Sequence, residues 1–228
     1  MRILGIDTSG AVAAVALYDH DADLFLGQQT VYTKRTHSQV ILPLVQRVLA
    51  DTGLTLSDID RFAVAAGPGS YTGLRIGIAA VKAMSFGLHA PCCGISTLEA
   101  LAFQAHLSGS GIVCPIMKAR QGLVYAGIYH FSGERCEVLM EDQLLPNEML
   151  LEQLYDFEDA VMLTGDGAAA FLEACSLSGA LLAPAMVRLQ NGCGLCRAAV
   201  MHEPVTPEQL EAKYLQLVKA EKDRLDKI

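Results

Sequence analysis

The chain has 228 residues, of which 52% are hydrophobic and 18% charged, and its net charge at pH 7 is −8. This composition supports a sizeable core and excludes a disordered chain. Proteins that wrap a phosphate backbone are basic, so the acidic balance argues against nucleic-acid binding by this chain alone. No apolar run reaches the ~18 residues of a membrane span. The apolar region in MRILGIDTSG, residues 1–10, is shorter than a signal peptide requires, so we expect no signal peptide.

The seven cysteines are an odd number, and two of them, Cys92 and Cys93, are adjacent. This usage favours a reducing cytosol over a disulfide framework, so we expect a cytoplasmic protein. Cys193 and Cys196 form a lone CxxC. A structural zinc site needs a second ligand pair at suitable spacing, and the sequence offers none, so we expect no bound metal.

The first half of the chain alternates strands and helices. Apolar segments at 2–8, 11–17 and 24–32 predict an antiparallel meander that begins with a buried strand. Helical spacing of Val40, Ile41, Leu44, Val45 and Val48 predicts a helix over 36–50, with Pro43 inside it. A buried strand at 61–66 precedes a glycine-rich loop and a helix from about Thr72 to Gly87, and GIST at 94–97 begins a further helix to about Leu107.

The second half follows a similar plan after SGSG at 108–111, the best candidate linker. Strands are predicted at 112–117, 123–131, 136–140 and 161–164, and helices at 146–156, 167–175, 191–202 and 208–227. The predicted class is therefore α/β with two lobes, 1–108 and a smaller 109–206, and the helix at 207–228 is expected to complete the first lobe. There is no close sequence repeat, but the second half loosely echoes the first.

The loop AGPGSYTGLRIG at 66–77 looks like a phosphate cradle. It is neither GxxxxGK[ST] nor GxGxxG. Its glycines nevertheless allow close backbone approach, Thr72 can cap the following helix, and Arg75 adds positive charge where free N–H groups attract anions. Two interpretations remain open: a structural turn from strand to helix, and a weak nucleotide-like cleft.

The helix behind this loop carries Gly73, Gly77, Ala80 and Met84 along one face. Small residues let another helix approach closely. The face could pack inside its own domain, or it could form an interface with a second protein together with the apolar helix that contains Val40, Leu44 and Val48.

Four motifs occur in order: GIDTS at 5–9, GPGSYTGLRIG at 67–77, GISTLEALA at 94–102 and KARQGLVYAGIY at 118–129. Together they closely resemble the bacterial TsaB family, also called YeaZ, over residues 2–129. The resemblance implies an actin-like ATPase (ribonuclease H-like) fold with two mixed five-stranded sheets and a reduced second lobe.

The resemblance also implies work in making threonylcarbamoyladenosine next to the anticodon of tRNAs that read ANN codons. In this family's pathway the related subunit TsaD transfers the group, and the ATPase TsaE joins the complex. A TsaB-like chain is then a non-catalytic scaffold that binds TsaD through helices of its N-terminal lobe. A homodimer is expected when TsaD is absent, tRNA is contacted indirectly, and ATP or ADP could sit at the TsaD interface although no cofactor is required.

Departures from related motifs bear on activity. Where TsaD-like proteins hold a metal with HxxxH, this chain has Thr97 and Leu101. Where the family usually has Asp before Ala-Arg, this chain has Lys118. Where the family has Tyr-Leu-Arg near the C-terminus, this chain has Gln216 in place of the arginine. The missing HxxxH disfavours TsaD-type catalysis and a peptidase, and Lys118, which replaces a metal-coordinating carboxylate, disfavours intrinsic ATP hydrolysis. A stand-alone actin-like ATPase or kinase, with Asp7 as its principal acid, is kept as the alternative. The nucleotide-like cleft implied by the resemblance comprises Asp7, Thr8, Ser9, Gly67, Gly69, Ser70, Thr72, Arg75 and Arg120.

Overall fold

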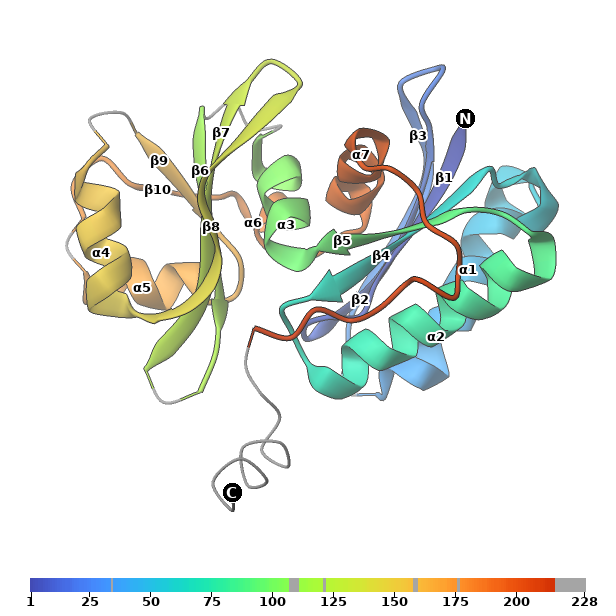
Figure 1. Cartoon of the computed structure of the whole chain (residues 1–228), viewed down its shortest axis with the longest axis horizontal. Helices are drawn as coiled ribbons and strands as arrows, with labels where there is room; N and C mark the ends of the chain where they lie inside the picture. Colours follow the sequence, from blue (N-terminus) through green and yellow to red (C-terminus); the bar gives the residue numbers. More distant parts are fainter. Residues whose placement is uncertain (34, 107–110, 121, 158–159, 176, 216–228) are drawn as a thin grey trace.

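The computed structural model describes residues 1–33, 35–106, 111–120, 122–157, 160–175 and 177–215, which fold into two α/β lobes side by side (Figure 1). Each lobe is built on one five-stranded sheet. Most of the linker expected at 108–111 lies outside the described residues.

The first lobe holds β1 (Arg2–Asp7), β2 (Val12–Asp19), β3 (Leu24–Tyr32), β4 (Arg61–Gly67) and β5 (Cys92–Ser96) in the order β3-β2-β1-β4-β5. β1, β2 and β3 pair antiparallel, whereas β4 and β5 continue the sheet in parallel with β1. The central strands β1, β2 and β4 are almost wholly buried, because helices cover both faces of the sheet.

Helices α1 (His37–Thr52) and α2 (Tyr71–Leu88) pack on one face of this sheet, and a short 3₁₀ turn (Leu56–Asp58) lies between them in sequence. Helices α3 (Thr97–His106) and α7 (Cys193–Met201) cover the opposite face. α1 ends at Gly53, which adopts a left-handed φ of 68° as a helix C-cap commonly does.

The second lobe repeats this plan. Its strands β6 (Ile112–Lys118), β7 (Leu123–Ser132), β8 (Arg135–Pro146), β9 (Val161–Thr164) and β10 (Leu181–Leu182) lie in the order β10-β9-β6-β7-β8. The pairings of β6 to β10 match those of β1 to β5 strand for strand. α4 (Asn147–Tyr155), α5 (Ala168–Ala174) and the single turn α6 (Ala185–Arg188) complete the lobe. The loose echo expected from the sequence is a duplicated topology.

Several expectations need correction. Residues 92–96 form strand β5, so α3 begins three residues later than the GIST motif indicated. The chain re-enters the first lobe by α7, earlier than the expected boundary at 206, since Cys196 packs against Gly5 of β1. Residues 207–215 are not helical but run along the first lobe, where Val205 pairs with Cys92. The rest of the predicted last helix lies outside the described residues.

The two lobes share part of their hydrophobic core. One cluster of buried side chains contains Ile3 and Ile95 from the first sheet, Leu98 from α3, and Val113 and Phe131 from the second sheet. α3 therefore serves both lobes. Within the described ranges, no helix is long and apolar enough to cross a membrane.

Candidate functional site

The end of β1 carries the strongest candidate acid, Asp7. Its side chain is 1% exposed, and its Oδ1 accepts hydrogen bonds from the backbone N of Ser9 at 2.8 Å and from the Ser9 hydroxyl at 2.6 Å. Burial raises the pKa of Asp7 to about 6, although both bonds from Ser9 oppose the rise. Asp7 is thus held by the hairpin that follows it.

The glycine-rich loop packs directly on this hairpin. The backbone N of Ser70 donates to the Ser9 carbonyl at 2.7 Å, and the Thr8 hydroxyl donates to the Gly73 carbonyl at 2.7 Å. A side chain at Gly69 would place its Cβ 2.5 Å from the Ser9 carbonyl oxygen. The hydroxyl of Ser70 caps α2 by accepting from the Gly73 N at 3.3 Å, the capping role that the sequence suggested for Thr72. Loop and hairpin form one packed unit.

Three segments far away in the sequence complete this unit, and sequence reasoning missed all of them. Gln190 donates from its amide to the Ser9 hydroxyl at 3.5 Å. The backbone N of Lys213 donates to the Ala66 carbonyl at 2.7 Å, and the ring of His37 bonds the Gly10 carbonyl at 2.8 Å. Nothing in the local sequence around these residues signals the contacts.

The other predicted cleft residues make contacts elsewhere. Thr72 and Arg75 are exposed in the first turns of α2, where the guanidinium of Arg75 lies 4.8 Å from the ring centre of Tyr71. Gly67 packs beside the carbonyl of Lys213. Arg120 is exposed in the second lobe, close enough to Tyr125 to affect its pKa. Among the described residues, no hydrogen bond joins Arg120 to the Asp7 hairpin, and a cleft between them stays a prediction.

The face of α2 that was predicted to bind a partner points instead toward the sheet of its own lobe. A Cβ on Gly73 would lie 2.0 Å from the Thr8 carbonyl oxygen, and one on Gly77 would lie 2.5 Å from the Thr8 hydroxyl. Met84 is 9% exposed and Val48 of α1 is 2% exposed. These residues pack on their own sheet, because only glycine lets α2 approach the end of β1 so closely.

α2 presents a different stripe to solvent. The exposed residues recur at helical spacing on its outer face and are mostly small or apolar: Thr72, Arg75, Ala79, Ala83 and Phe86. We call this set the outer stripe of α2. Val40 of α1 is half-buried, and Leu44 of α1 and Ala80 of α2 are half-buried against the first-lobe core.

The end of β6 occupies the place in the second lobe that Asp7 has in the first. Lys118 stands there, exposed, and its backbone N donates to Oδ1 of Asp166 at 2.9 Å. The positions of the HxxxH motif, Thr97 and Leu101, are 0% and 1% exposed. Among the described residues, no group of three or more His, Cys, Asp or Glu side chains is placed to hold a metal ion.

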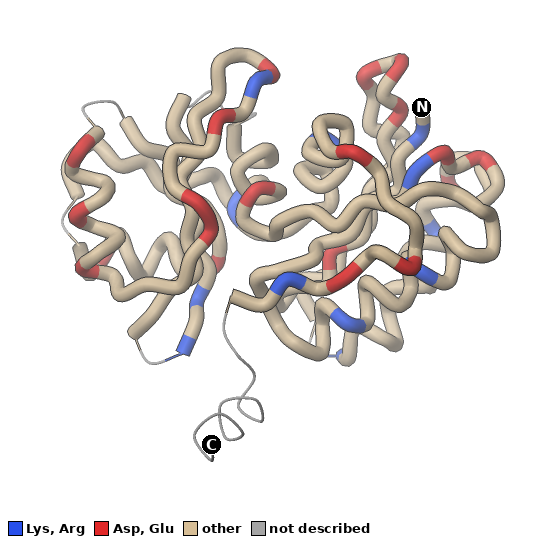
Figure 2. Tube along the Cα trace, viewed as in Figure 1, with Lys and Arg blue, Asp and Glu red and all other residues tan. Residues whose placement is uncertain are grey.

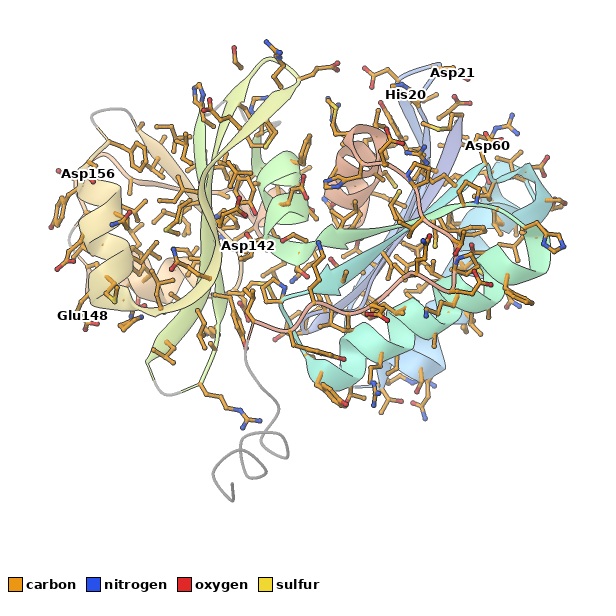
Figure 3. The ribbon with its side chains drawn as sticks, viewed as in Figure 1. His20, Asp21, Asp60, Asp142, Glu148 and Asp156 are labelled. Atoms are coloured by element: carbon orange, nitrogen blue, oxygen red, sulfur yellow. The ribbon has the colours of Figure 1, made fainter. Side chains whose placement is uncertain are left out.

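A polar cluster joins the lobes across α3. The carboxylate of Asp142 in β8, labelled in Figure 3, accepts hydrogen bonds from the hydroxyl of Ser96, the last residue of β5 before α3, and from the Tyr129 hydroxyl of β7. Burial raises the pKa of Asp142, opposed by these two bonds. Nearby, Glu99 of α3 bonds the ring of His202 at 2.8 Å. The cluster ties β8 to the first lobe.

The two cysteines of the CxxC motif are buried at the start of α7. Cys193 donates from its thiol to the side-chain oxygen of Gln28 at 2.7 Å. Burial raises the pKa of Cys193 to about 12 and that of Cys196 above its ordinary value. Since reactive cysteines have lowered pKa values, this pair is a packing element.

Two lobes with duplicated sheets, joined through helices, define a protein of the actin-like ATPase fold. A family model described as "TsaD: tRNA N6-adenosine threonylcarbamoyltransferase" matches residues 29–202. The Bacillus subtilis (strain 168) protein named tRNA threonylcarbamoyladenosine biosynthesis protein TsaB is 34% identical over 165 residues, which cover 72% of this chain and 71% of that protein. The chain belongs to the TsaB (YeaZ) family, as the sequence motifs predicted.

Further relatives agree. The Escherichia coli (strain K12) protein of the same name is 36% identical over 158 residues, covering 65% of this chain and 66% of the relative. A solved structure described as YeaZ from Pseudomonas aeruginosa matches with a TM-score of 0.80 and 26% identity, covering 94% of this chain and 99% of that one. A second Pseudomonas aeruginosa structure, with a TM-score of 0.82, 27% identity and coverage of 94% and 99%, is described as similar to "peptidase YEAZ".

Proposed function

We propose that this chain is a non-catalytic subunit of the machinery that makes threonylcarbamoyladenosine in tRNA, and that it binds the catalytic TsaD-type subunit through the outer surfaces of α1 and α2. The observation that carries the role in this pathway is the match to the Bacillus subtilis TsaB protein over 72% of the chain. A TsaE-type ATPase and tRNA are then further members of the assembly.

The packing around Asp7 supports a scaffold rather than an enzyme. In an actin-like ATPase the hairpin after the first strand holds phosphate, and its acid orients a metal ion and water. Here Ser9 takes up one oxygen of the Asp7 carboxylate, and Ser70 and Gln190 bond to Ser9. The position corresponding to a second acid carries Lys118, whose positive charge would repel a metal ion. Bound nucleotide would have to displace these contacts.

The outer surfaces of α1 and α2 suit a protein partner. Phe86 and Leu88 on α2 are 64% and 36% exposed, and Leu42 on α1 is 49% exposed. The two helices lie next to each other on the outer side of the first sheet (Figure 1). The small exposed side chains of Ala79 and Ala83 on α2 leave room for close approach of a second helix pair. The same surface would serve a homodimer when the partner is absent.

The distribution of charge supports an indirect role toward tRNA. Residues 111–190 contain eleven Asp and Glu against four Lys and Arg, which accounts for −7 of the net charge of −8 (Figure 2). The described acids of this lobe include Glu148 and Glu152 on α4 and Asp156 at the C-cap of that helix. A phosphate backbone is repelled by such a surface, so the partner subunits supply the positive charge that tRNA requires.

The test is a charge placed on the outer stripe of α2. Ala83 is exposed, so A83R should leave the fold intact while reducing affinity for the TsaD-type subunit of the same organism by about tenfold or more. A170R on α5, also an exposed helical alanine, is the matched control. Affinity is measured by calorimetry and complex mass by light scattering. Wild-type affinity of A83R would place the interface elsewhere, and a wild-type chain that ignores the partner would refute the proposed function.

A stand-alone ATPase is the second candidate. The observation in its favour is the buried Asp7 with a pKa raised to about 6, since perturbed acids concentrate at functional sites. ATP turnover by the purified chain that is lost in D7A would support it. Turnover that D7A leaves unchanged would not come from this site.

A further inference from the structure

A groove of about 410 Å³ lies at the C-terminal end of α2, at the opposite end of this helix from the Asp7 hairpin. One wall consists of the last turns of α2 and the turn after it, including Phe86, His89 and Pro91. Residues 204–209, which run along the first lobe, form the other wall. A volume of this size lies within the range of small-molecule pockets and leaves room for a long side chain.

The groove is held by hydrogen bonds that do not depend on any partner. The backbone groups of Cys92 and Val205 exchange two bonds, of 3.0 Å and 2.7 Å, and join the walls. The backbone N of Thr206 donates to the side-chain oxygen of Gln209 at 3.1 Å, and the backbone N of Gln209 donates back to the Thr206 carbonyl at 3.1 Å. This fixed turn presents Glu208, so the groove is preorganised.

The chemistry of the walls selects the occupant. Phe86 is 64% exposed, and the rings of Pro91, Pro204 and Pro207 add apolar surface without any backbone N–H to donate. Glu208 contributes an exposed carboxylate. Apolar walls beside an anionic acceptor fit a side chain with an aliphatic stem and a cationic head, and the aromatic ring of Phe86 adds attraction for the cation.

We propose that this groove binds an arginine or lysine side chain of the TsaD-type catalytic subunit, with the stem against Phe86 and the prolines and the cationic head at Glu208. The inference rests on the proposed function. Phe86 ends the outer stripe of α2, so a partner lying along that stripe reaches the groove without leaving the surface. A hydrogen bond from the Thr206 side chain and, to a lesser extent, the charge of Lys82 lower the pKa of Glu208 and keep it ionised, and a carboxylate with two oxygens can still accept from a further cation.

The first test measures the affinity of the chain for the catalytic subunit of the same organism by calorimetry. E208K and F86A should weaken binding by about tenfold and about fivefold, and E208Q by less than E208K. Because Glu208 is charged and exposed, the loss in E208K should shrink as salt rises. The matched controls are E152K and Y155A on α4 in the second lobe, where Tyr155 is 62% exposed, and both should bind as wild type does.

The outcomes separate the two proposals. Wild-type affinity of E208K and F86A, together with weakened binding by A83R, would refute the groove and leave the proposed function standing. A wild-type chain that does not bind the catalytic subunit would refute both.

A second test needs no partner. N-acetyl-arginine amide, titrated into the isotope-labelled chain, should shift backbone NMR resonances in 85–91 and 205–209. E208K should abolish these shifts, and N-acetyl-glutamate amide should not produce them. Equal shifts with both compounds would contradict the selectivity for a cation.

Discussion

Replacing Gly73 with alanine tests whether this face of α2 packs on its own lobe or is free for a partner. The two interpretations predict opposite signs for the change in the free energy of unfolding. An alanine at Gly73 would place its Cβ 2.0 Å from the Thr8 carbonyl oxygen, about 1.4 Å inside ordinary contact, and that oxygen belongs to the backbone and cannot rotate away. Helix α2 must therefore move from β1, and overpacking of this kind costs about 1–3 kcal/mol or more. If the face were free, G73A would instead gain up to about 1 kcal/mol of helix propensity.

The assay is thermal and urea unfolding of the purified chain without any partner. We expect G73A to lose about 3 kcal/mol, which lowers the Tm of a chain of this size by about 6–12 °C. Gly87, on the same helix, is the matched control. No atom lies within 4 Å of a Cβ built there, so G87A should gain about 0.5–1 kcal/mol. If G73A is stabilised as G87A is, the contact between α2 and Thr8 is not part of the fold.

The remaining predictions concern titratable groups and are measured by urea unfolding at two pH values. Burial raises the pKa of Asp7 to about 6. The contribution of Asp7 to stability therefore falls as pH rises from about 4, where the unfolded carboxyl titrates, to about 6, and this contribution is constant at higher pH. D7N should therefore gain more at pH 7.5 than at pH 4, by up to about 3 kcal/mol, and an equal gain at both would contradict the burial of the charge. The Glu99 carboxylate raises the pKa of His202, so their pair stabilises the fold below the unfolded histidine pKa of about 6.5 and is lost as pH rises through the folded value. H202Q should then cost more at pH 5.5 than at pH 8.5, and the reverse order would refute the pairing. D142A leaves the hydroxyl of Tyr129, a residue 3% exposed, without its acceptor. It should therefore lower the free energy of unfolding by about 1–3 kcal/mol, whereas D142N keeps an acceptor. Equal stability of the two variants would show that the contact contributes nothing.

The sequence predicted well those elements whose own residues indicate whether they are buried or exposed. β1 and β4 are short apolar runs, the pattern that strands buried on both faces of a sheet have. β5 was missed because Gly94 and Ser96 in GIST resemble a helix start, and only its pairing with β4 makes the segment a strand. Residues 207–215 have helical periodicity but extend along the lobe, where the Lys213 N bonds to the Ala66 carbonyl.

For the candidate site the sequence by itself determined what is local. Asp7 and Ser9 are two residues apart, and the cap at Ser70 is three residues from Gly73, so short motifs contain both arrangements. The four ordered motifs likewise identified the family and its fold, which the comparisons confirmed. The partner surface, the role in tRNA modification and the absence of a required cofactor stay predictions, and the binding experiments above address the first of them.

The tertiary structure alone decided which face of α2 is free and what covers the Asp7 hairpin. A stripe of small residues permits close approach to any neighbour, so the spacing of Gly73 and Gly77 could not distinguish a partner helix from the protein's own β1. Gln190 reaches Ser9 across 181 positions of sequence. Contacts of that kind depend on how two lobes and a returning chain are placed in space, and no local pattern of residues encodes that placement.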